Sequence, residues 1–453
     1  MDAASFRERF GSLRILWQTR LGGYCLGLED LVPVAVVVSM DDGPDFDAIE
    51  RESGIRFCSY ERTLGRRLVL DDDGIDLLIG ALRGKVEAAL RDSPPEHWVA
   101  VCPYACRTLP EFAATAGIRG TALDWDRFWW FSDKKNLQAG QTELRLPRMP
   151  GRWLCLRPAR YSELASEFGA RFVVQAAVGA AGNATAMVES EVEFSEAAER
   201  FGGADVWLAP YAGSLSFNVN AVAAGKGTAV GYPSVQIVGQ PALGSRRGGH
   251  CGNDFSATAE VSRTLLDSIR EQTARIGDWM ARRGYRGLFG LDFVVYDATG
   301  EACAVDLNPR WQGSTSLQTQ AERRQGRLPL AAAAIAWQLC LLDDSELRQM
   351  SDSFFEPLEG AQMFPKNRKP GYWKATRALD IGPLRLSEAQ SLEQVLISGG
   401  IPRPGRPLAP GVTLLRISSL RQSVDPFTGQ LRAWAQEAAR TVYDRLALEP
   451  ETA

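Results

Sequence analysis

Histidine is scarce in this sequence: His97 and His250 are the only two in 453 residues. Because histidine is the side chain most often used for proton transfer near neutral pH, this scarcity argues against histidine-based catalysis. Cysteine is sparse too, with eight residues scattered along the chain. Their number and scatter do not fit a disulfide framework and indicate reduced thiols in a cytoplasmic protein. The segment CPYAC at 102–106 has poor zinc spacing, so buried structural cysteines are expected there.

Long apolar runs and blocks of one charge are also missing. The longest apolar candidates, LVPVAVVV and AAAAIAWQLCLL, are shorter than the roughly 18 residues of a membrane span. The first residues, MDAASFRERFGSLRI, carry charges where a secretory signal needs its apolar segment. The 51 basic and 55 acidic residues give a net charge of -4 without long blocks of either sign. These features argue against nucleic acid and membranes as partners, and favour a small or medium-sized substrate.

What is present first is an alternation of strand and helix patterns. Short apolar runs such as LRILWQ, LVPVAVVVS and HWVAVCPY are separated by helical patterns such as DLLIGALRGKVEAALRD. This alternation predicts an α/β layer with a parallel sheet. The composition changes at 124–131, where DWDRFWWF concentrates aromatic residues. We therefore expect an N-terminal α/β domain over 1–122.

From residue 171 the pattern changes to strands, glycine loops and helices. Strand-like segments such as RFVVQ, DVWLAPYAG and SFNVN precede a polar stretch at 242–257, which predicts a mobile loop, and a helix over about 258–283. The last segment, LRAWAQEAARTVYDRLA, has the apolar spacing of an amphipathic helix. These patterns predict an α+β domain over 123–342, with a glycine-loop subdomain at about 134–212, and a C-terminal α+β region over 343–453.

The segment FGLDFVVYDATGEACAVDLNPR predicts a β-hairpin that presents carboxylates on one face. A three-residue loop at 298–300, with Gly300 in the left-handed conformation, makes cross-strand partners whose numbers sum to 598. Asp292 then lies directly opposite Asp306. Val305 and Leu307 are expected on the buried face, and Asp306, Asn308 and Arg310 on the open one.

Two carboxylates on opposed strand positions repel each other unless a positive charge lies between them. Mg²⁺ needs few protein carboxylates and completes its shell with water and substrate phosphates, so Asp292, Asp306 and Asn308 suit a Mg²⁺–nucleotide complex. Arg310 would contact the phosphate charge. The alternative is an ordinary hairpin with a solvated polar face, which the apolar opposite side disfavours.

The block from RRGYRGLFGLDF to DLNPRWQGS resembles the ATP-grasp superfamily of ligases. The resemblance covers roughly residues 120–340, and the preceding α/β region is similar to the N-terminal domain of these enzymes. It implies that Asp292, Asp306 and Asn308 hold Mg²⁺ between ATP phosphates, and that Arg310 contacts the phosphates or an acyl phosphate.

Further motifs of the resemblance concern the nucleotide. In SDKKNLQAG, either Lys134 or Lys135 takes the place of the lysine that precedes the small subdomain. The segment RFVVQAAVGAAGNAT resembles the glycine loop over the triphosphate, and DVWLAPYAG resembles the linker at adenine. The nucleotide-binding residues implied by these segments are Gly179, Gly182, Asn183, Thr185, Trp207, Leu208 and Ala209. Gln175 stands where the family usually has a second phosphate lysine, and Ser216 and Asn220 replace its usual acidic residues.

The resemblance implies an ATP- and Mg²⁺-dependent ligase that joins a carboxylate to an amine through an acyl phosphate. Amino acids or peptides are the expected substrates, and a homodimer is one candidate assembly. The arginines 246 and 247 of the polar stretch are candidates for recognising a substrate carboxylate. Two alternatives stay open: a regulatory or inactive nucleotide-binding protein, suggested by Gln175, and a carboxylase or thioester-forming ligase of the same superfamily.

Overall fold

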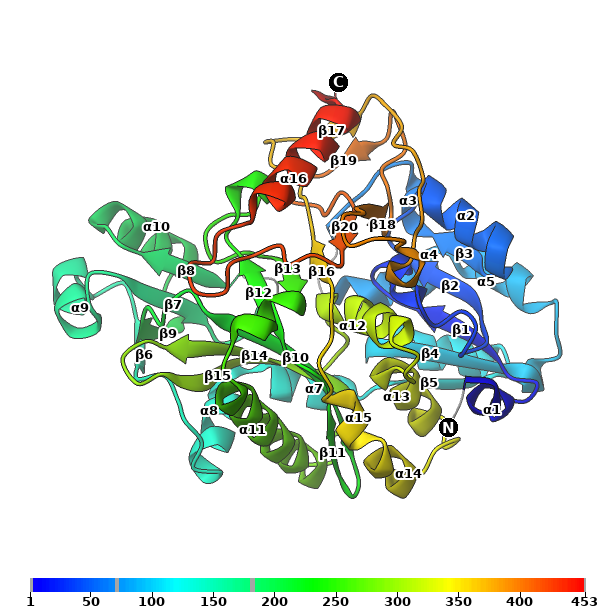
Figure 1. Cartoon of the computed structure of the whole chain (residues 1–453), viewed down its shortest axis with the longest axis horizontal. Coiled ribbons are helices and arrows are strands. Elements are labelled where there is room, and N and C mark those ends of the chain that lie inside the picture. The colour runs from blue at the N-terminus through cyan, green and yellow to red at the C-terminus, as the bar shows by residue number, and fades with distance from the viewer. Residues whose placement is uncertain (1–2, 70–72, 180–183, 452–453) are drawn as a thin grey trace.

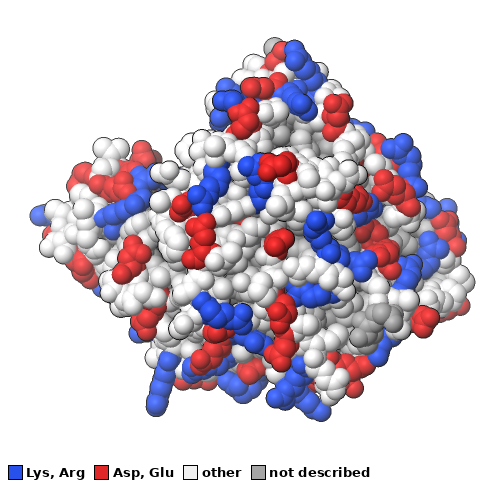
Figure 2. All heavy atoms as spheres, in the orientation of Figure 1, with Lys and Arg blue, Asp and Glu red and all other residues white. Residues whose placement is uncertain are grey.

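The structure is a computed structural model that describes residues 3–69, 73–179 and 184–451 (Figure 1). No helix in these described ranges is long and apolar enough to cross a membrane. Basic and acidic side chains are interspersed over the face shown in Figure 2, as the nearly balanced composition leads one to expect.

The N-terminal region contains a parallel five-stranded sheet in the order β3-β2-β1-β4-β5, which confirms the predicted α/β class. Its apolar runs are buried along nearly their whole length, as expected when helices cover both faces of a parallel sheet. The strands are β1 (Arg14–Gln18), β2 (Val34–Ser39), β3 (Arg56–Ser59), β4 (Trp98–Ala105) and β5 (Arg119–Leu123). The helices are α1 (Ala3–Glu8), α2 (Pro44–Ser53), α3 (Tyr60–Leu64), α4 (Asp76–Ala81), α5 (Arg83–Leu90) and α6 (Thr108–Thr115).

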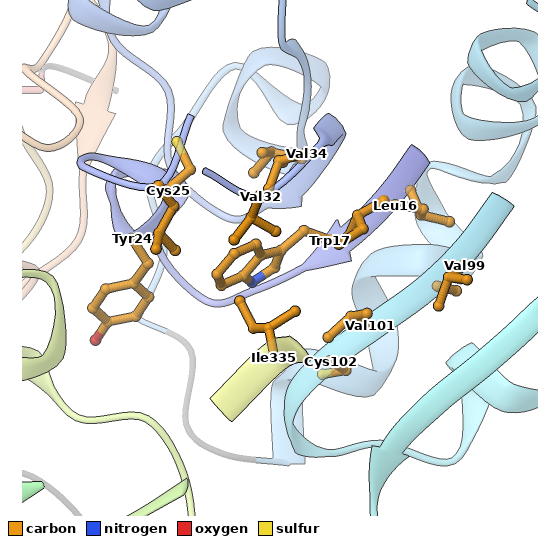
Figure 3. Close-up of a cluster of buried hydrophobic side chains, with 14 of the residues drawn as sticks. Leu16, Trp17, Tyr24, Cys25, Val32, Val34, Val99, Val101, Cys102 and Ile335 are labelled. Atoms are coloured by element: carbon orange, nitrogen blue, oxygen red, sulfur yellow. The ribbon is translucent and has the colours of Figure 1, made fainter. Parts of the chain in front are cut away.

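The core of this region is built around Trp17 of β1, which is 1% exposed. Figure 3 shows its indole among side chains of β4, of the segment before β2 and of α13 (Leu330–Gln338), which contributes Ile335. Trp311, from the loop after the predicted carboxylate hairpin, packs edge-on against Trp17 with ring centroids 4.9 Å apart. This contact joins the N-terminal sheet to the segment that carries Arg310.

A small antiparallel sheet in the order β6-β9-β7-β8, on the left in Figure 1, lies within the range predicted for the glycine-loop subdomain, and we call the sheet with its helices the small subdomain. Its strands are β6 (Arg152–Cys155), β7 (Phe172–Ala176), β8 (Thr185–Val188) and β9 (Asp205–Pro210). Helices α9 (Tyr161–Phe168) and α10 (Glu191–Phe201) pack on one face, where Phe172, Val174 and Leu208 are buried. The alternate residues of the strands therefore point to the opposite face, toward the rest of the molecule.

The central sheet has nine strands and includes parts of the C-terminal region. Its order is β15-β14-β10-β12-β13-β16-β20-β18, with β11 paired to β10. The strands are β10 (Ser216–Ala224), β11 (Gly227–Val230), β12 (Ser234–Val238), β13 (His250–Asp254), β14 (Gly287–Tyr296), β15 (Glu301–Asn308), β16 (Ala361–Met363), β18 (Leu396–Ser398) and β20 (Arg416–Ser419). The chain after residue 343 thus extends the sheet that carries the carboxylate hairpin.

Helices and a fourth sheet complete the described structure. The helices are α7 (Trp125–Ser132), α8 (Lys134–Glu143), α11 (Arg263–Arg282), α12 (Gly313–Arg324), α14 (Asp344–Gln349), α15 (Ser351–Phe354) and α16 (Ala433–Leu446). Strands β17 (Trp373–Ala375), β19 (Pro407–Leu408) and β21 (Leu448–Pro450) form the fourth sheet, in the order β19-β17-β21. The predicted terminal helix is confirmed as α16.

Two sequence predictions about this part of the chain were wrong in detail. The helix predicted from about 258 begins at Arg263, because the hydroxyl of Ser262 accepts the N–H of Leu265 at 3.3 Å and caps it. The stretch predicted as a mobile loop at 242–257 contains β13, which pairs with both β12 and β16. Its polar residues Asn253 and Asp254 are buried and hydrogen-bonded, so polarity there marks internal contacts.

Candidate functional site

A cleft of about 650 Å³ lies between the small sheet, the central sheet and the N-terminal region. One wall consists of the inward residues of β7, β8 and β9, among them Gln175, Thr185 and Trp207. The floor comes from β10, β14 and β15, with Asn218, Asp292 and Asp306. Residues far apart in the sequence, from Arg20 to Gln430, therefore meet in one cavity.

Polar residues form rows across three neighbouring strands of the floor. Asn218 of β10 pairs with Asp292 of β14, which pairs with Asp306 of β15. The next row on this face is Asn220, Gly290 and Asn308. Neighbouring residues of the first row have Cβ atoms about 5 Å apart. The carboxylates and the amide that the resemblance assigns to Mg²⁺ are thus brought together.

The hairpin reaches this register by a route different from the predicted one. Tyr296 pairs with Glu301, so the turn has four residues, at 297–300, instead of three. A bulge between Asp292 and Phe293 then shifts the pairing by one residue and restores Asp292 opposite Asp306. Gly300 has φ +72°, as predicted. Because of the bulge, Val305 lines the cleft beside Asp306 and is not on the buried face, which corrects the predicted alternation.

Amide groups surround the buried carboxylate of this floor. Asn218 Nδ2 donates to Asp292 Oδ1 at 2.6 Å, and Asn308 Nδ2 donates to Oδ2 at 3.5 Å. Burial, followed by the nearby Asp306 carboxylate, raises the pKa of Asp292 above its usual value. The site therefore holds two acidic groups that repel each other, which is the arrangement a cation relieves.

The protein supplies only some of the ligands that Mg²⁺ needs. In the described ranges no group of three or more His, Cys, Asp or Glu side chains is placed to hold a metal. Two carboxylates plus the amide oxygen of Asn308 suit an ion that keeps water and phosphate ligands. For this, Asn308 must turn its amide, because its nitrogen now faces Asp292. The residues present thus fit Mg²⁺ held jointly with a phosphate-bearing ligand.

The two lysines at the start of α8 have different surroundings. Lys134 is 5% exposed, and its Nζ lies 2.9 Å from Asp306 Oδ1. It borders a small space of about 20 Å³ that also touches Gln175, Trp207 and Val305 of the cleft. Lys135 is exposed, and its Nζ lies 3.8 Å from Asp205 and over the Trp153 ring. Only Lys134 therefore reaches the carboxylate pair.

The segment after β15 is fixed by packing so that its polar residues face the cleft. Trp311 is buried in the N-terminal core, and its N–H donates to the Pro103 carbonyl at 3.3 Å. Its neighbours Arg310 and Gln312 line the cleft. Gln312 occupies the space over Gly290, where an added Cβ would lie 0.9 Å from Gln312 Nε2. Glycine at this strand position thus makes room for an amide side chain beside the aspartates.

The wall of the small sheet carries most of the predicted nucleotide residues. Gln175 and Thr185 share a hydrogen bond of 3.3 Å, and both line the cleft with Trp207 and Ala209. Leu208 points away, into the core beneath α9 and α10, so only its backbone is available to the cleft. Gly179 contacts the chain at Ala184, at the base of the glycine loop. Gly182 and Asn183 lie outside the described residues.

Sequence reasoning missed several residues of the site. Asn218 was not assigned a role, although the polar alternation of SFNVN on an apolar strand was a usable signal. Arg247, a candidate for recognising substrate, lines the cleft and lies 2.6 Å from Glu189 and 2.8 Å from Glu193 of the small subdomain. It joins the 244–249 loop to that subdomain across the cleft. Burial and then the charge of Arg200 lower the pKa of Arg246.

Known proteins resemble this chain in fold but not detectably in sequence. No protein-family model matches the sequence, and no curated protein matches it. Solved structures do match along nearly the whole chain. Carboxyaminoimidazole ribonucleotide synthase from Aspergillus clavatus, complexed with ATP, has a TM-score of 0.54 at 13% identity, covering 97% of this chain and 99% of that one. Biotin carboxylase from Campylobacter jejuni has a TM-score of 0.59 at 15% identity, covering 96% and 92%.

A third similar structure is the biotin carboxylase domain of the Hydrogenobacter thermophilus 2-oxoglutarate carboxylase, in complex with MgADP and bicarbonate. Its TM-score is 0.57 at 15% identity, covering 97% of this chain and 90% of that one. The chain therefore has the ATP-grasp fold that its motifs predict, including the N-terminal and C-terminal regions. At these identities the likeness defines the fold, and the chemistry has to be argued from the site.

Proposed function

We propose that this protein is an ATP- and Mg²⁺-dependent ligase that joins a carboxylate to an amine through an acyl phosphate. The observation that carries the proposal is the pairing of Asp292 with Asp306 on the floor of a cleft, with Lys134 2.9 Å from Asp306. Opposed carboxylates beside a buried lysine and an arginine suit a metal–triphosphate ligand, because phosphoryl transfer depends on positioning and charge neutralisation.

The roles follow from the chemistry of each group. Asp292, Asp306 and Asn308 would hold Mg²⁺, and Mg²⁺ when bound would offset the charge of the ATP phosphates. Lys134 and Arg310 would stabilise charge on the transferred phosphoryl group. Gln175, Thr185 and the glycine loop at 179–185 would contact the phosphates, and the adenine would lie along β9 at 207–209. These assignments combine the resemblance with the lining of the cleft.

The reaction needs no nucleophilic side chain. A substrate carboxylate oxygen attacks the γ-phosphorus of ATP, and ADP leaves. The amine then attacks the acyl carbon, inorganic phosphate leaves, and the amine loses one proton as the C–N bond forms. Amino acids or peptides are the proposed substrates.

The test is release of ADP and phosphate from Mg–ATP across a panel of amino acids and peptides, with product masses recorded. We expect substrate-dependent release and a product one water lighter than the summed reactants. The Asp306→Ala, Asn308→Ala double variant should lose at least about 10³-fold in rate, since it removes two groups from the charged centre. Glu301→Ala is the matched control, because it removes an exposed carboxylate from the same strand. ATP binding without release on any substrate would favour a regulatory protein instead.

A carboxylase of the same superfamily is the second candidate. It is favoured by the structural matches, which include biotin carboxylases and a carboxyaminoimidazole ribonucleotide synthase. In that case bicarbonate would be the acid, and the acceptor nitrogen would gain a carboxyl group. Adding labelled bicarbonate to the same assay separates the two, because only the carboxylase transfers label to its product.

A further inference from the structure

The cleft is unusually basic for a chain with a net charge of -4. Two acidic residues, Asp292 and Asp306, line it, against six basic ones: Arg20, Arg171, Arg247, Arg310, Lys366 and Arg416. ATP phosphates and the carboxylate pair would account for the positive groups near the floor. Arg416 lies on β20, in the C-terminal part of the sheet, and requires a separate explanation.

Arg416 is buried without a partner for the end of its side chain. It is 1% exposed, and neither Nη1 nor Nη2 has a hydrogen-bond partner in the described part of the chain. Its guanidinium lies 4.9 Å from the Tyr24 ring and 5.9 Å from the Phe364 ring, both of which line the cleft. Gly399 leaves room for the arginine stem, since a Cβ there would be 2.7 Å from Arg416 Cδ.

A second buried arginine shows how such a group is normally accommodated here. Arg67 is 3% exposed, and its Nε donates to Glu61 Oε2 at 2.8 Å. Its other nitrogens donate to the carbonyls of Asp42 and Leu414 at 2.7 and 2.8 Å. Leaving a buried charge without such bonds is costly. Arg416 is therefore the exception, and it lines the cleft.

Tyr24 adds a second unpartnered group at the same place. It is fully buried, and its hydroxyl has no hydrogen-bond partner among the residues that the structure describes. Figure 3 shows the ring at the edge of the Trp17 cluster, with the hydroxyl pointing away from Trp17. The hydroxyl and the two guanidinium nitrogens are donors that an anionic oxygen can satisfy together.

Acidic groups near Arg416 do not complete its bonds. Burial raises the pKa of Asp41 to about 7, and the charges of Arg67 and, more weakly, of Arg416 oppose this rise. Asp41 Oδ1 accepts the N–H of Gly22 at 2.7 Å. Among the described residues no ion pair joins Arg416 to a carboxylate. The helix α12 begins at Gly313 on the same cleft, so its positive end adds to the field.

We propose that Arg416 and Tyr24 bind an anionic group of the substrate, a carboxylate or a phosphate other than the carboxylate that ATP activates. This proposal extends the proposed function, and it rests on that function in one respect: the anion is taken to be part of the ligase substrate. We name Arg416 and the part of the cleft around it, with Tyr24 and Phe364, the donor end.

The test measures binding of two probes, succinate and inorganic phosphate, to the full chain by calorimetry at constant ionic strength with Mg–ADP present. We expect saturable binding of at least one probe. Arg416→Gln should weaken it by at least about tenfold, because a two-nitrogen contact to an anion is lost. Tyr24→Phe should weaken it by about threefold, since one neutral hydroxyl is removed.

Three comparisons make the result decisive. Arg421→Gln, which removes a partly exposed arginine paired to Glu393, should leave probe binding unchanged. The Asp306→Ala, Asn308→Ala variant should also retain it, so a failure of the proposed ligase reaction is distinguishable. Without probe, Arg416→Gln should melt no lower than the parent protein, because neither terminal nitrogen of the arginine makes a hydrogen bond in the described structure.

Succinate binding that depends on Arg416 assigns a carboxylate, and phosphate binding assigns a phosphate. Probe binding that is insensitive to both Arg416→Gln and Tyr24→Phe, or absent, overturns the proposal. A large fall in the melting temperature of ligand-free Arg416→Gln overturns it as well, because that result makes Arg416 a structural residue.

Discussion

The two ends of the cleft differ in whether their polar side chains have hydrogen-bond partners. Around Asp292 and Asp306, amide and ammonium groups already donate to the carboxylates, with Asn218 at 2.6 Å and Lys134 at 2.9 Å. At the donor end, Arg416 and Tyr24 are more deeply buried than these aspartates, yet the two Nη atoms and the hydroxyl have no hydrogen-bond partners in the described chain. The first arrangement is organised before any ligand binds. The second keeps an energetic cost that an incoming anion removes.

Among the substitutions that test this difference, we expect the largest loss of activity at Lys134. Lys134→Met should lower the rate of ATP turnover by about 10²–10³-fold, because it removes a buried charge that would stabilise the transferred phosphoryl group. Lys135→Met is the matched control and should change the rate by less than about threefold, since its ammonium is exposed and lies 3.8 Å from Asp205, outside the carboxylate pair. Steady-state ADP release measures both. Equal losses in the two variants would contradict the assignment of Lys134.

A smaller effect concerns His250, which lies between the two ends and lines the cleft. Burial and then the charge of Lys366 lower the pKa of His250 to about 4. Between that value and about 6.5 the unfolded chain binds a proton that the folded chain does not, so stability falls as the pH decreases through this window.

We therefore expect His250→Gln to reduce the loss of unfolding free energy between pH 8 and pH 5 by about 2 kcal/mol. Urea unfolding at the two pH values measures the difference. His97→Gln is the matched control, because His97 is the only other histidine in the chain. If the loss of unfolding free energy at low pH disappears in His97→Gln but persists in His250→Gln, His250 is not its source.

The smallest effect tests the wall of the small sheet. Gln175→Lys should tighten ATP binding by up to about tenfold, because an ammonium replaces a neutral amide at the proposed phosphate contact. Gln175→Ala should change the affinity by less than about threefold. Calorimetry with a non-hydrolysable ATP analogue measures both. If the lysine variant binds ATP no more tightly, Gln175 does not face the phosphates. The neutral amide of Gln175 then does not account for weak ATP binding.

Local sequence patterns predicted the parts of this molecule that local rules determine. Apolar runs gave the parallel sheet, and the alternation on β14 and β15 gave the opposition of Asp292 and Asp306. The turn length was wrong, and the bulge that compensates for it was not foreseen. A bulge reflects how the hairpin packs against its neighbours, so the spacing of Val305 and Asp306 did not reveal that both face the cleft.

Other features depend on contacts between distant residues. Whether Lys134 or Lys135 reaches the carboxylates depends on how α8 packs, because both begin the same helix. Arg416 and Tyr24 lie in segments from opposite ends of the chain, and nothing in either segment indicates the other. Burial without a partner is a property of the folded structure alone, so the donor end was outside the reach of sequence reasoning.

The course of the C-terminal chain through the central sheet has a consequence for biosynthesis. Strand β20 is hydrogen-bonded to β16 and β18, and Arg67 of the N-terminal region donates to the carbonyl of Leu414. The N-terminal sheet can form early, because its strands are consecutive in the chain, but the donor end requires residues near 416 to leave the ribosome. A nascent chain would therefore complete its carboxylate hairpin before it could recognise an anionic substrate through Arg416.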